Sequence, residues 1–224
     1  MSNRPLPRRA CLALLLAVWS APAVLLAQDN VIRLRRASEP PAVDGAVADG
    51  EYASGLRMHH SLLRFFQFRE VFPLGSTHLA WHGDRLYACW VSPLREGEYP
   101  VSRTFLRDTT RVALDNSVEL YLAPPAAAGE PPTVYQFIGN ARGAYYDTRN
   151  EPAIGQSFPQ WDGRFEFANG AEVGEQWVSE LSLPLADLGI PAGRVGDGLT
   201  FGIDLARDGG FAPQSYSMAF SRYQ

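Results

Sequence analysis

The chain has 224 residues, of which 46% are hydrophobic and 20% charged, and its formal net charge at pH 7 is −4. This length suits one medium-sized domain with a sizeable apolar core, and the acidic balance disfavours nucleic acid and anionic membrane surfaces as partners. All 20 basic residues are arginines, which excludes lysine chemistry such as Schiff-base formation.

The first 27 residues have the pattern of a secretory signal peptide. Arg4, Arg8 and Arg9 form a basic start, and the compact apolar run Cys11–Trp19 leads to a small-residue exit at Ala27. We expect cleavage after Ala27, with the segment Ala21-Pro22-Ala23 as the second choice. Cleavage after Ala27 leaves residues 28–224 as a secreted or periplasmic domain without a membrane segment. Removing three arginines and no acidic residue changes the net charge from −4 to −7.

Two other features of the composition bear on the compartment and the core. A retained membrane anchor over residues 10–27 is disfavoured, because Ser20 and Pro22 interrupt a segment that is already short for a bilayer. Cys11 leaves with the signal peptide, so Cys89 has no partner for an internal disulfide. Its neighbours Tyr87 and Trp90 indicate a buried core thiol rather than a nucleophile.

Short alternating runs bounded by Gly, Pro, Asn and Asp recur beyond the signal, and no segment shows ten residues of helical apolar spacing. We expect one helical turn at Pro184–Leu188 and otherwise strands joined by hairpins and long loops. Without helices for crossovers, the strands predict an antiparallel β-sandwich of jelly-roll or immunoglobulin-like type. The expected strands, in chain order, are Val31–Ala37, Leu62–Val71, Thr77–Trp81, Arg85–Ser92, Asp115–Leu122, Thr133–Asn140, Ala144–Thr148, Arg164–Glu172, Gln176–Leu183, Leu199–Leu205 and Ser215–Ser221.

The strand Asp115–Leu122 is the most informative of these. Its alternation puts Val118, Leu120 and Leu122 on one face, which suits a core, and puts Glu119 beside Tyr121 on the other face. A carboxylate next to an aromatic ring on the second face marks the place where we expect function.

A series of short segments follows in a fixed order from about Pro41 to Tyr216. They are Val43-Asp44-Gly45 with Glu51-Tyr52, Trp81–Val91, Arg107-Asp108, Asp115–Leu122, Tyr135–Ile138 with Asn140 and Gly143, Asp147, Trp177–Pro184, Arg207 and Tyr216. In this order and spacing the chain resembles the family 9 carbohydrate-binding modules, which are sugar-binding domains often attached to xylanases. The resemblance implies a DOMON-like β-sandwich that binds ends of sugars or polysaccharides between two tryptophans and carries structural calcium.

The resemblance also implies a set of ligand-binding residues. Glu119 would accept sugar hydroxyl protons, whereas Asn140 and Arg142 at a hairpin tip would donate hydrogen bonds. The chain departs from the family where it has Ala113 six residues before Glu119 in place of a tryptophan, and Asn116 and Tyr216 in place of an aspartate and the second tryptophan. Trp161, on a long loop, could supply a substitute stacking platform or could instead form a lid over the end of the sandwich. The expected site therefore consists of Glu119, Asn140, Arg142, Trp161, Arg207 and Tyr216.

Other notable residues have structural interpretations that we favour. Trp81, Trp90 and Trp177 lie within strands and are expected in the core, and Arg107-Asp108 is expected to form a local ion pair. The acidic residues do not match a compact calcium loop, so any calcium site must combine distant segments. The candidate calcium ligands are Asp44, Asp49, Asp84, Asp108, Asp115, Asp147 and Asp162.

The sequence thus predicts a non-catalytic, monomeric domain that binds an oligosaccharide or polysaccharide of the xylan or cellulose type and assists polysaccharide degradation. Three alternatives remain: a structural or assembly sandwich that has lost sugar binding, a glycoside hydrolase-associated activity, and a haem-binding DOMON-type electron-transfer domain. No haem is expected, because no Cys-x-x-Cys-His segment exists and no spacing singles out an axial pair. The possible axial residues are Met58, His59, His60, His78, His82 and Met218.

Overall fold

The computed structural model describes residues 34–64, 69–94, 96–97, 99–172, 175–191, 202–209 and 216–220. All of them belong to one compact unit, Arg33–Gln224, and the expected signal peptide lies outside the described residues. No helix in these ranges is long and apolar enough to cross a lipid bilayer.

The described residues form strands and short 3-10 helices, without an α-helix. The 3-10 helices are η1 (Thr110–Leu114), η2 (Pro152–Ile154) and η3 (Leu185–Leu188). The strands are β1 (Leu56–Arg64), β2 (Arg69–His82), β3 (Arg85–Pro93), β4 (Asn116–Ala123), β5 (Val134–Asn140), β6 (Tyr145–Glu151), β7 (Gln156–Phe158), β8 (Glu166–Glu172), β9 (Gln176–Pro184), β10 (Gly202–Gly209) and β11 (Tyr216–Phe220).

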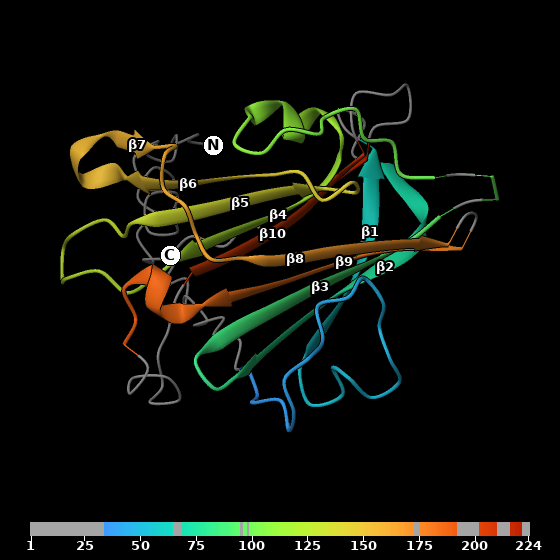
Figure 1. Ribbon diagram of the computed structural model, residues 1–224, viewed down its shortest axis with the longest axis horizontal. Coiled ribbons are helices and arrows are strands. Elements are labelled where there is room, and N and C mark those ends of the chain that lie inside the picture. Colours follow the sequence, from blue (N-terminus) through green and yellow to red (C-terminus); the bar gives the residue numbers. More distant parts are fainter. Residues whose placement is uncertain are drawn as a thin grey trace, which may run out of the picture. The chain divides into compact units, whose positions relative to one another are not determined.

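Hydrogen bonds link the strands in the order β7-β6-β5-β4-β10-β11-β1-β2-β3-β9-β8, and every strand pair is antiparallel (Figure 1). Strands β4 and β5 pack face to face with strands β3, β9 and β8, which gives two layers. The aromatic ring of Phe137 on β5, for example, contacts that of Phe167 on β8, with 5.0 Å between ring centroids. One apolar core lies between the two layers and includes Leu120 on β4, Trp90 on β3 and Leu181 on β9. The expected all-β antiparallel sandwich is therefore confirmed.

Most of the expected hairpins are present, including β2–β3, β5–β6 and β8–β9, and η3 supplies the expected helical turn. Trp90 and Trp177 are each 1% exposed and Cys89 is fully buried, so these core predictions are confirmed. Trp81 is only partly buried, although its ladder partner Leu86 belongs to the core, and its Nε1 donates to the carbonyl oxygen of Leu34 at 3.3 Å. The core prediction for Trp81 is therefore wrong.

Three expectations about strands are corrected. Val31–Ala37 is not a strand in its described part, where Arg36 makes only an isolated parallel bridge to Trp81. The single strand expected at Leu62–Val71 is instead the end of β1 and the start of β2. The loop expected at residues 149–162 contains the end of β6, η2 and β7.

Strand β2 continues through Pro73, which lies between the expected strands Leu62–Val71 and Thr77–Trp81. The register between β1 and β2 shifts there, since Ser61 pairs with Leu74 whereas Leu62 pairs with Val71. Pro73 thus lies in a two-residue irregularity without a ladder partner. A proline lacks the N–H that a regular ladder position needs, so a bulge is the place where a strand can tolerate it.

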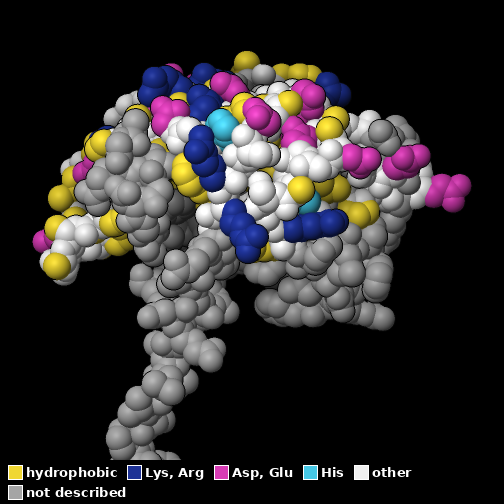
Figure 2. Space-filling view, turned by 90° about the horizontal axis from the view of Figure 1, so that it is seen from below, with side chains coloured by type: hydrophobic (Ala, Val, Ile, Leu, Met, Phe, Trp, Pro, Cys, Tyr) yellow, Lys and Arg dark blue, Asp and Glu magenta, His cyan; other side chains and the backbone are white. Residues whose placement is uncertain are grey.

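The opening loop, residues 37–52, covers the outer surface of β2, β3 and β9. This loop lies at the bottom of Figure 1. Its Tyr52 packs with Ala80, Tyr87 and Cys89 in a second apolar cluster. Seen from that side, arginine and acidic side chains lie among one another on the surface (Figure 2). Burial raises the pKa of the Cys89 thiol, which suits an inert core residue.

A buried carboxylate on β9 holds this loop in place. Glu180 is fully buried and accepts hydrogen bonds from the backbone N–H groups of Asp44 and Gly45, at 3.1 and 2.9 Å, and from the hydroxyl of Tyr52 at 3.1 Å. Three donors offset much of the cost of burying the carboxylate, although burial still raises its pKa. Gly45 has a φ of +85°, and a Cβ there would lie 2.4 Å from the backbone carbon of Asn169.

Gly45→Ala should therefore destabilise the protein by roughly 3 kcal/mol, since it combines an unfavourable positive φ with a backbone clash. Gly50→Ala is a matched control, because Gly50 has a φ of +83° but nothing within 4 Å of the position that a Cβ would occupy. It should cost only about 1 kcal/mol. Urea unfolding followed by tryptophan fluorescence measures both variants, and equal losses would contradict the proposed close packing.

Candidate functional site

The outer face of β4 and β5 carries a row of polar side chains. Val118, Leu120 and Leu122 point into the core as expected, so Glu119 and Tyr121 lie on the opposite face, where both are half-buried. Tyr121 pairs with Gln136 of β5 in the ladder, which brings a third polar side chain into the row.

Hydrogen bonds join these three side chains. The Tyr121 hydroxyl donates to Oε2 of Glu119 at 3.0 Å, and Nε2 of Gln136 donates to the Tyr121 hydroxyl at 2.6 Å. The row therefore presents a carboxylate, a phenol and an amide in fixed orientations on a sheet surface. Such groups can exchange hydrogen bonds with vicinal hydroxyls of a ligand.

The 3-10 helix η1 packs beside this row on the same face. Its Val112 is fully buried against Ile138 of β5 and Ala144, and Ala113 packs against the same cluster. Ile138 is the ladder partner of Glu119, so Ala113 lies next to the carboxylate row. The position where the family has a tryptophan is thus near Glu119, as the resemblance implies, but here it offers only a methyl group.

Asn140 is fully buried at the end of β5, and its amide is completely occupied. Its Nδ2 donates to the carbonyl oxygen of Thr104 and to Oδ2 of Asp115, both at 2.9 Å. Its Oδ1 accepts the backbone N–H groups of Arg142 and Ala144, at 3.1 and 3.0 Å. All four hydrogen-bonding positions of the amide therefore serve the protein rather than a ligand.

Asp115 is the partner that completes this anchor. It is 4% exposed and accepts backbone N–H groups from Arg103 and Thr104, each at 2.9 Å. Burial alone would raise the pKa of this carboxyl, but these hydrogen bonds and that from Asn140 lower it below its usual value. Asn140 and Asp115 together fix the backbone at residues 103–104 onto the β5–β6 hairpin.

Arg142 lies exposed at the tip of this hairpin. Its guanidinium carbon is 4.6 Å from the ring centroid of Phe105, which is within cation–π range. Arg142 is therefore available to a ligand, whereas Asn140 beneath it is not.

Trp161 lies on the other side of the sheet from Glu119. Its ring contacts Tyr135, with 4.9 Å between centroids, and Phe165, with 5.8 Å. Tyr135 alternates with Gln136 along β5, so it points to the core side, away from the polar row. Trp161 thus closes an edge of the aromatic core and does not share a surface with Glu119.

The two remaining predicted residues can be placed only by register. Arg207 of β10 is paired with Val118 of β4, and Ala206 is the residue paired with Glu119. Tyr216 of β11 is paired with Arg64 of β1, two strands away from β4 in the ladder. The structure therefore brings Glu119, Asn140 and Arg142 together on one face and separates Trp161 from them.

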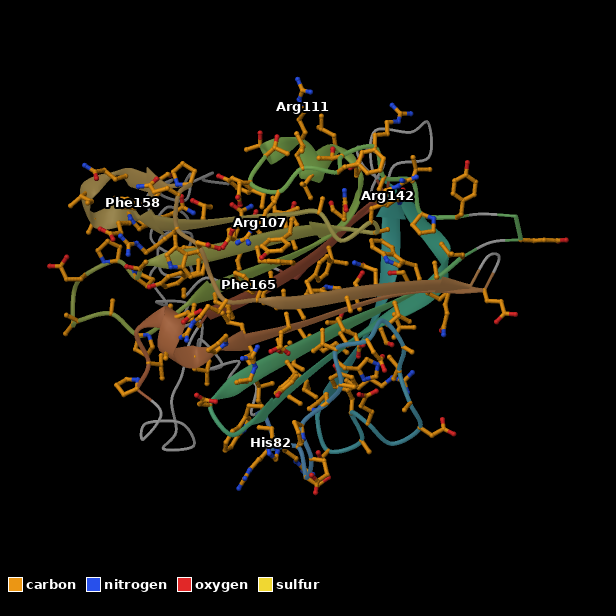
Figure 3. The ribbon with its side chains drawn as sticks, viewed as in Figure 1. His82, Arg107, Arg111, Arg142, Phe158 and Phe165 are labelled. Carbon is orange, nitrogen blue, oxygen red and sulfur yellow. The ribbon has the colours of Figure 1, made fainter. Side chains whose placement is uncertain are left out.

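Arg107 has the structural contacts expected for it, and more. Its Nε lies 3.4 Å from Oδ1 of Asp108, it also pairs with Asp162, and its guanidinium lies 4.3 Å from the ring centroid of Tyr145 (Figure 3). The local ion pair is thus confirmed. Asp162 belongs to the long loop, so Arg107 connects two segments that are distant in sequence.

Asp147 is a buried carboxylate on β6 next to this group. Its Oδ2 accepts the backbone N–H of Gly163 at 2.7 Å, whereas Oδ1 has no hydrogen-bond partner among the described residues. Burial raises its pKa to about 6, because the loss of hydration outweighs the Gly163 hydrogen bond and the Arg107 charge.

The described residues contain no group of three His, Cys, Asp or Glu side chains that could hold a metal ion. The candidate calcium ligands Asp115 and Asp147 hold backbone N–H groups instead. Of the possible haem ligands, Met58 packs against the core, whereas His78 lies on the outer face of β2 near Ser76. His59, His60 and Met218 have side chains outside the described part of the chain.

Sequence reasoning missed two residues of the site. Gln136 belongs to a segment that carried the resemblance, but only the observed register shows that it faces Tyr121. Phe105 lies between the expected strands Arg85–Ser92 and Asp115–Leu122, and its exposure could not be inferred from alternation, because the segment is not a strand.

Asn140→Ala should destabilise the protein by about 3 kcal/mol or more, because it leaves buried backbone groups and Asp115 without a partner. Asn150→Ala is the control, since the Asn150 amide accepts one hydrogen bond, from Ser157, at the surface. It should cost less than about 1 kcal/mol. Thermal unfolding measures both, and a loss for Asn140→Ala no larger than that for Asn150→Ala would refute the anchor.

Asp147 should make stability depend on pH. Because its pKa in the folded protein, about 6, lies above the ordinary value of 3.8, its contribution to stability is present below pH 3.8 and is lost as the pH rises through 6. The Asp147→Asn variant lacks this loss. The difference in free energy of unfolding, variant minus wild type, should therefore rise by up to about 3 kcal/mol between about pH 4 and about pH 7. Urea unfolding across this range tests it, and a constant difference would contradict the raised pKa.

Comparison with known proteins gives matches at the level of structure. No protein-family model and no curated protein matches the sequence. A putative carbohydrate-binding protein from Bacteroides uniformis superposes with a TM-score of 0.50 at 16% identity, over 75% of this chain and 80% of that one. A family 9 carbohydrate-binding module from Caldicellulosiruptor kristjanssonii, solved with glucose and with cellotriose, gives TM-scores of 0.48 at 14% identity over 84% of this chain and 85% and 84% of the module chains. The chain thus shares the antiparallel β-sandwich fold of the Bacteroides protein, which is the fold that its resemblance to family 9 modules predicts.

Proposed function

We propose that the protein is a non-catalytic carbohydrate-binding domain that uses the outer face of β4 and β5. The observation that carries the proposal is the hydrogen-bonded row of Glu119, Tyr121 and Gln136. The Glu119 carboxylate, held by the Tyr121 hydroxyl, can accept hydrogen bonds from two sugar hydroxyls. The Gln136 amide can both donate and accept hydrogen bonds. The buried apolar cluster of Ile138 and Val112 holds η1 beside the row on the same face.

Two further considerations support binding of a sugar. The sequence resembles family 9 modules over most of its mature length, and the structural neighbour from Bacteroides uniformis is itself named a putative carbohydrate-binding protein. On this basis the ligands are oligosaccharides or polysaccharide ends of the xylan or cellulose type. The expected signal peptide would bring the domain outside the cytoplasm, where it could assist polysaccharide degradation.

The buried carboxylates favour binding over hydrolysis. Glycoside hydrolases place two carboxyl groups across the scissile bond. Here Asp115 and Glu180 are buried and hold backbone N–H groups of loops, so neither is presented to a ligand. Among the described side chains of β4 and β5, Glu119 is the carboxylate on the proposed binding face.

Glu119→Gln should weaken binding of xylotriose or cellotriose at least about tenfold, because a hydrogen bond to a charged group contributes about 1.5–3 kcal/mol. Glu166→Gln is the control, since Glu166 is an exposed carboxylate in the other layer of the sandwich, paired with Arg85. The Glu166→Gln variant should bind both sugars as tightly as wild type does. Isothermal titration with and without calcium measures the sugar affinity of wild type and of the two variants.

Absence of heat for the wild-type protein at millimolar sugar would overturn the proposal and favour a structural role. Release of reducing sugar from xylan would instead favour the hydrolase alternative. A loss of affinity in Glu166→Gln equal to that in Glu119→Gln would show that the binding face is placed wrongly.

A further inference from the structure

The segment of residues 99–114, called the strap here, exposes several large apolar side chains. Tyr99 is 62% exposed, Phe105 68%, Leu106 74% and Leu114 52%. Among the described residues, this segment holds most of the large apolar side chains that face solvent. Single exposed apolar residues are ordinary, but a concentration of them on one segment is typical of a contact surface.

The Phe105 ring is attached to a rigid backbone. The N–H of Thr104 donates to Oδ2 of Asp115 at 2.9 Å, and the carbonyl oxygen of Thr104 accepts from Asn140 at 2.9 Å. Arg142 then packs on the ring itself. An exposed aromatic side chain that is fixed before binding loses little conformational entropy when a ligand stacks on it.

Positively charged side chains lie on the strap and on the neighbouring β5–β6 hairpin tip. Arg103, Arg111 and Arg142 are exposed and have no carboxylate within ion-pairing distance in the described part of the chain, whereas Arg107 pairs with Asp108 and Asp162. Arg111 extends away from the sheet in Figure 3. These guanidinium groups lie on a protein whose net charge is negative. A local reversal of charge selects for an anionic ligand.

The strap lies next to the proposed binding face. Asn140, which holds Thr104, pairs with Ser117, and Ser117 is two residues before Glu119 on the same face. Asn140 is therefore a diagonal neighbour of Glu119, roughly 7–8 Å away between Cα atoms. A glycan held at Glu119 can extend toward Phe105 by one or a few sugar units.

We propose that Phe105 and Arg142 form a second subsite, which binds a carboxylate-bearing sugar, a uronic acid, within a glycan held at Glu119. Phe105 provides the stacking ring, and Arg142 provides a guanidinium that can hold the sugar carboxylate through two hydrogen bonds. Arg103 and Arg111 contribute to the positive potential around it. The proposal rests on the carbohydrate-binding function proposed above and specifies the acidic class of glycan.

Isothermal titration of the full chain tests the subsite with two probes, trigalacturonic acid and neutral xylotriose. Wild type should bind the acidic trisaccharide more tightly, and only that binding should weaken severalfold when salt rises from about 50 to about 500 mM. Phe105→Ala should reduce affinity for the acidic probe about fivefold or more, and Arg142→Gln about tenfold. Leu106→Ala is the matched control, because Leu106 is the adjacent exposed apolar residue. Its affinity should equal that of wild type.

The outcomes separate this inference from the proposed function. If xylotriose binds through Glu119 but the acidic probe binds no more tightly and the Phe105 and Arg142 variants are unchanged, the subsite is refuted and the binding function stands. If Leu106→Ala loses as much affinity as Phe105→Ala, the ring has no specific role and the inference also fails. If wild type binds neither probe, both proposals fail.

Circular dichroism and thermal unfolding of each variant show whether a lost affinity reflects lost folding. A folded Phe105→Ala variant with unchanged affinity for the acidic probe overturns the subsite.

Discussion

The structure depends on buried side chains that accept hydrogen bonds from the backbone N–H groups of loops lying on the sheets. A loop that covers a sheet brings N–H groups away from water, and each of them needs an acceptor. On one layer the acceptor is Glu180, which holds residues 44–45, and on the other layer it is Asp115, supported by Asn140. Both carboxylates belong to or adjoin core strands, so the rigidity of the sandwich is transmitted to the loops.

This arrangement explains why two of the motifs behind the sequence resemblance need not be ligand-binding motifs. The Asp44-Gly45 turn and Tyr52 contact Glu180, and Asn140 contacts Asp115. Both sets of residues are largely internal to the fold. A sequence resemblance built on such residues indicates the architecture more strongly than it indicates the ligand, which has to be argued from groups that solvent can reach.

Alternation along strands predicted much of the fold. The faces of β4 were assigned correctly, because Val118, Leu120 and Leu122 are apolar in strict period two. The boundaries of β1 and β2 were not, because Pro73 and Gly75 looked like breaks although the chain accommodates the proline in a bulge. For the site, Glu119 could be predicted from its strand. The position of Trp161 could not be predicted, because it depends on the side of β5 on which a long loop crosses. Tyr135 on one side of β5 and Gln136 on the other could each have been its neighbour.

The contact between the opening loop and β8 links two glycines that are distant in the sequence. A Cβ on Gly45 would meet the backbone of Asn169, and a Cβ on Gly170 would lie 2.2 Å from the carbonyl oxygen of Gly45. Both side chains would occupy the same narrow space, so loss of either glycine already separates the two segments. Their effects on stability should then be strongly non-additive, with the second change adding little. The two glycines thus act as one energetic unit, because the close fit of the opening loop against β8 requires both.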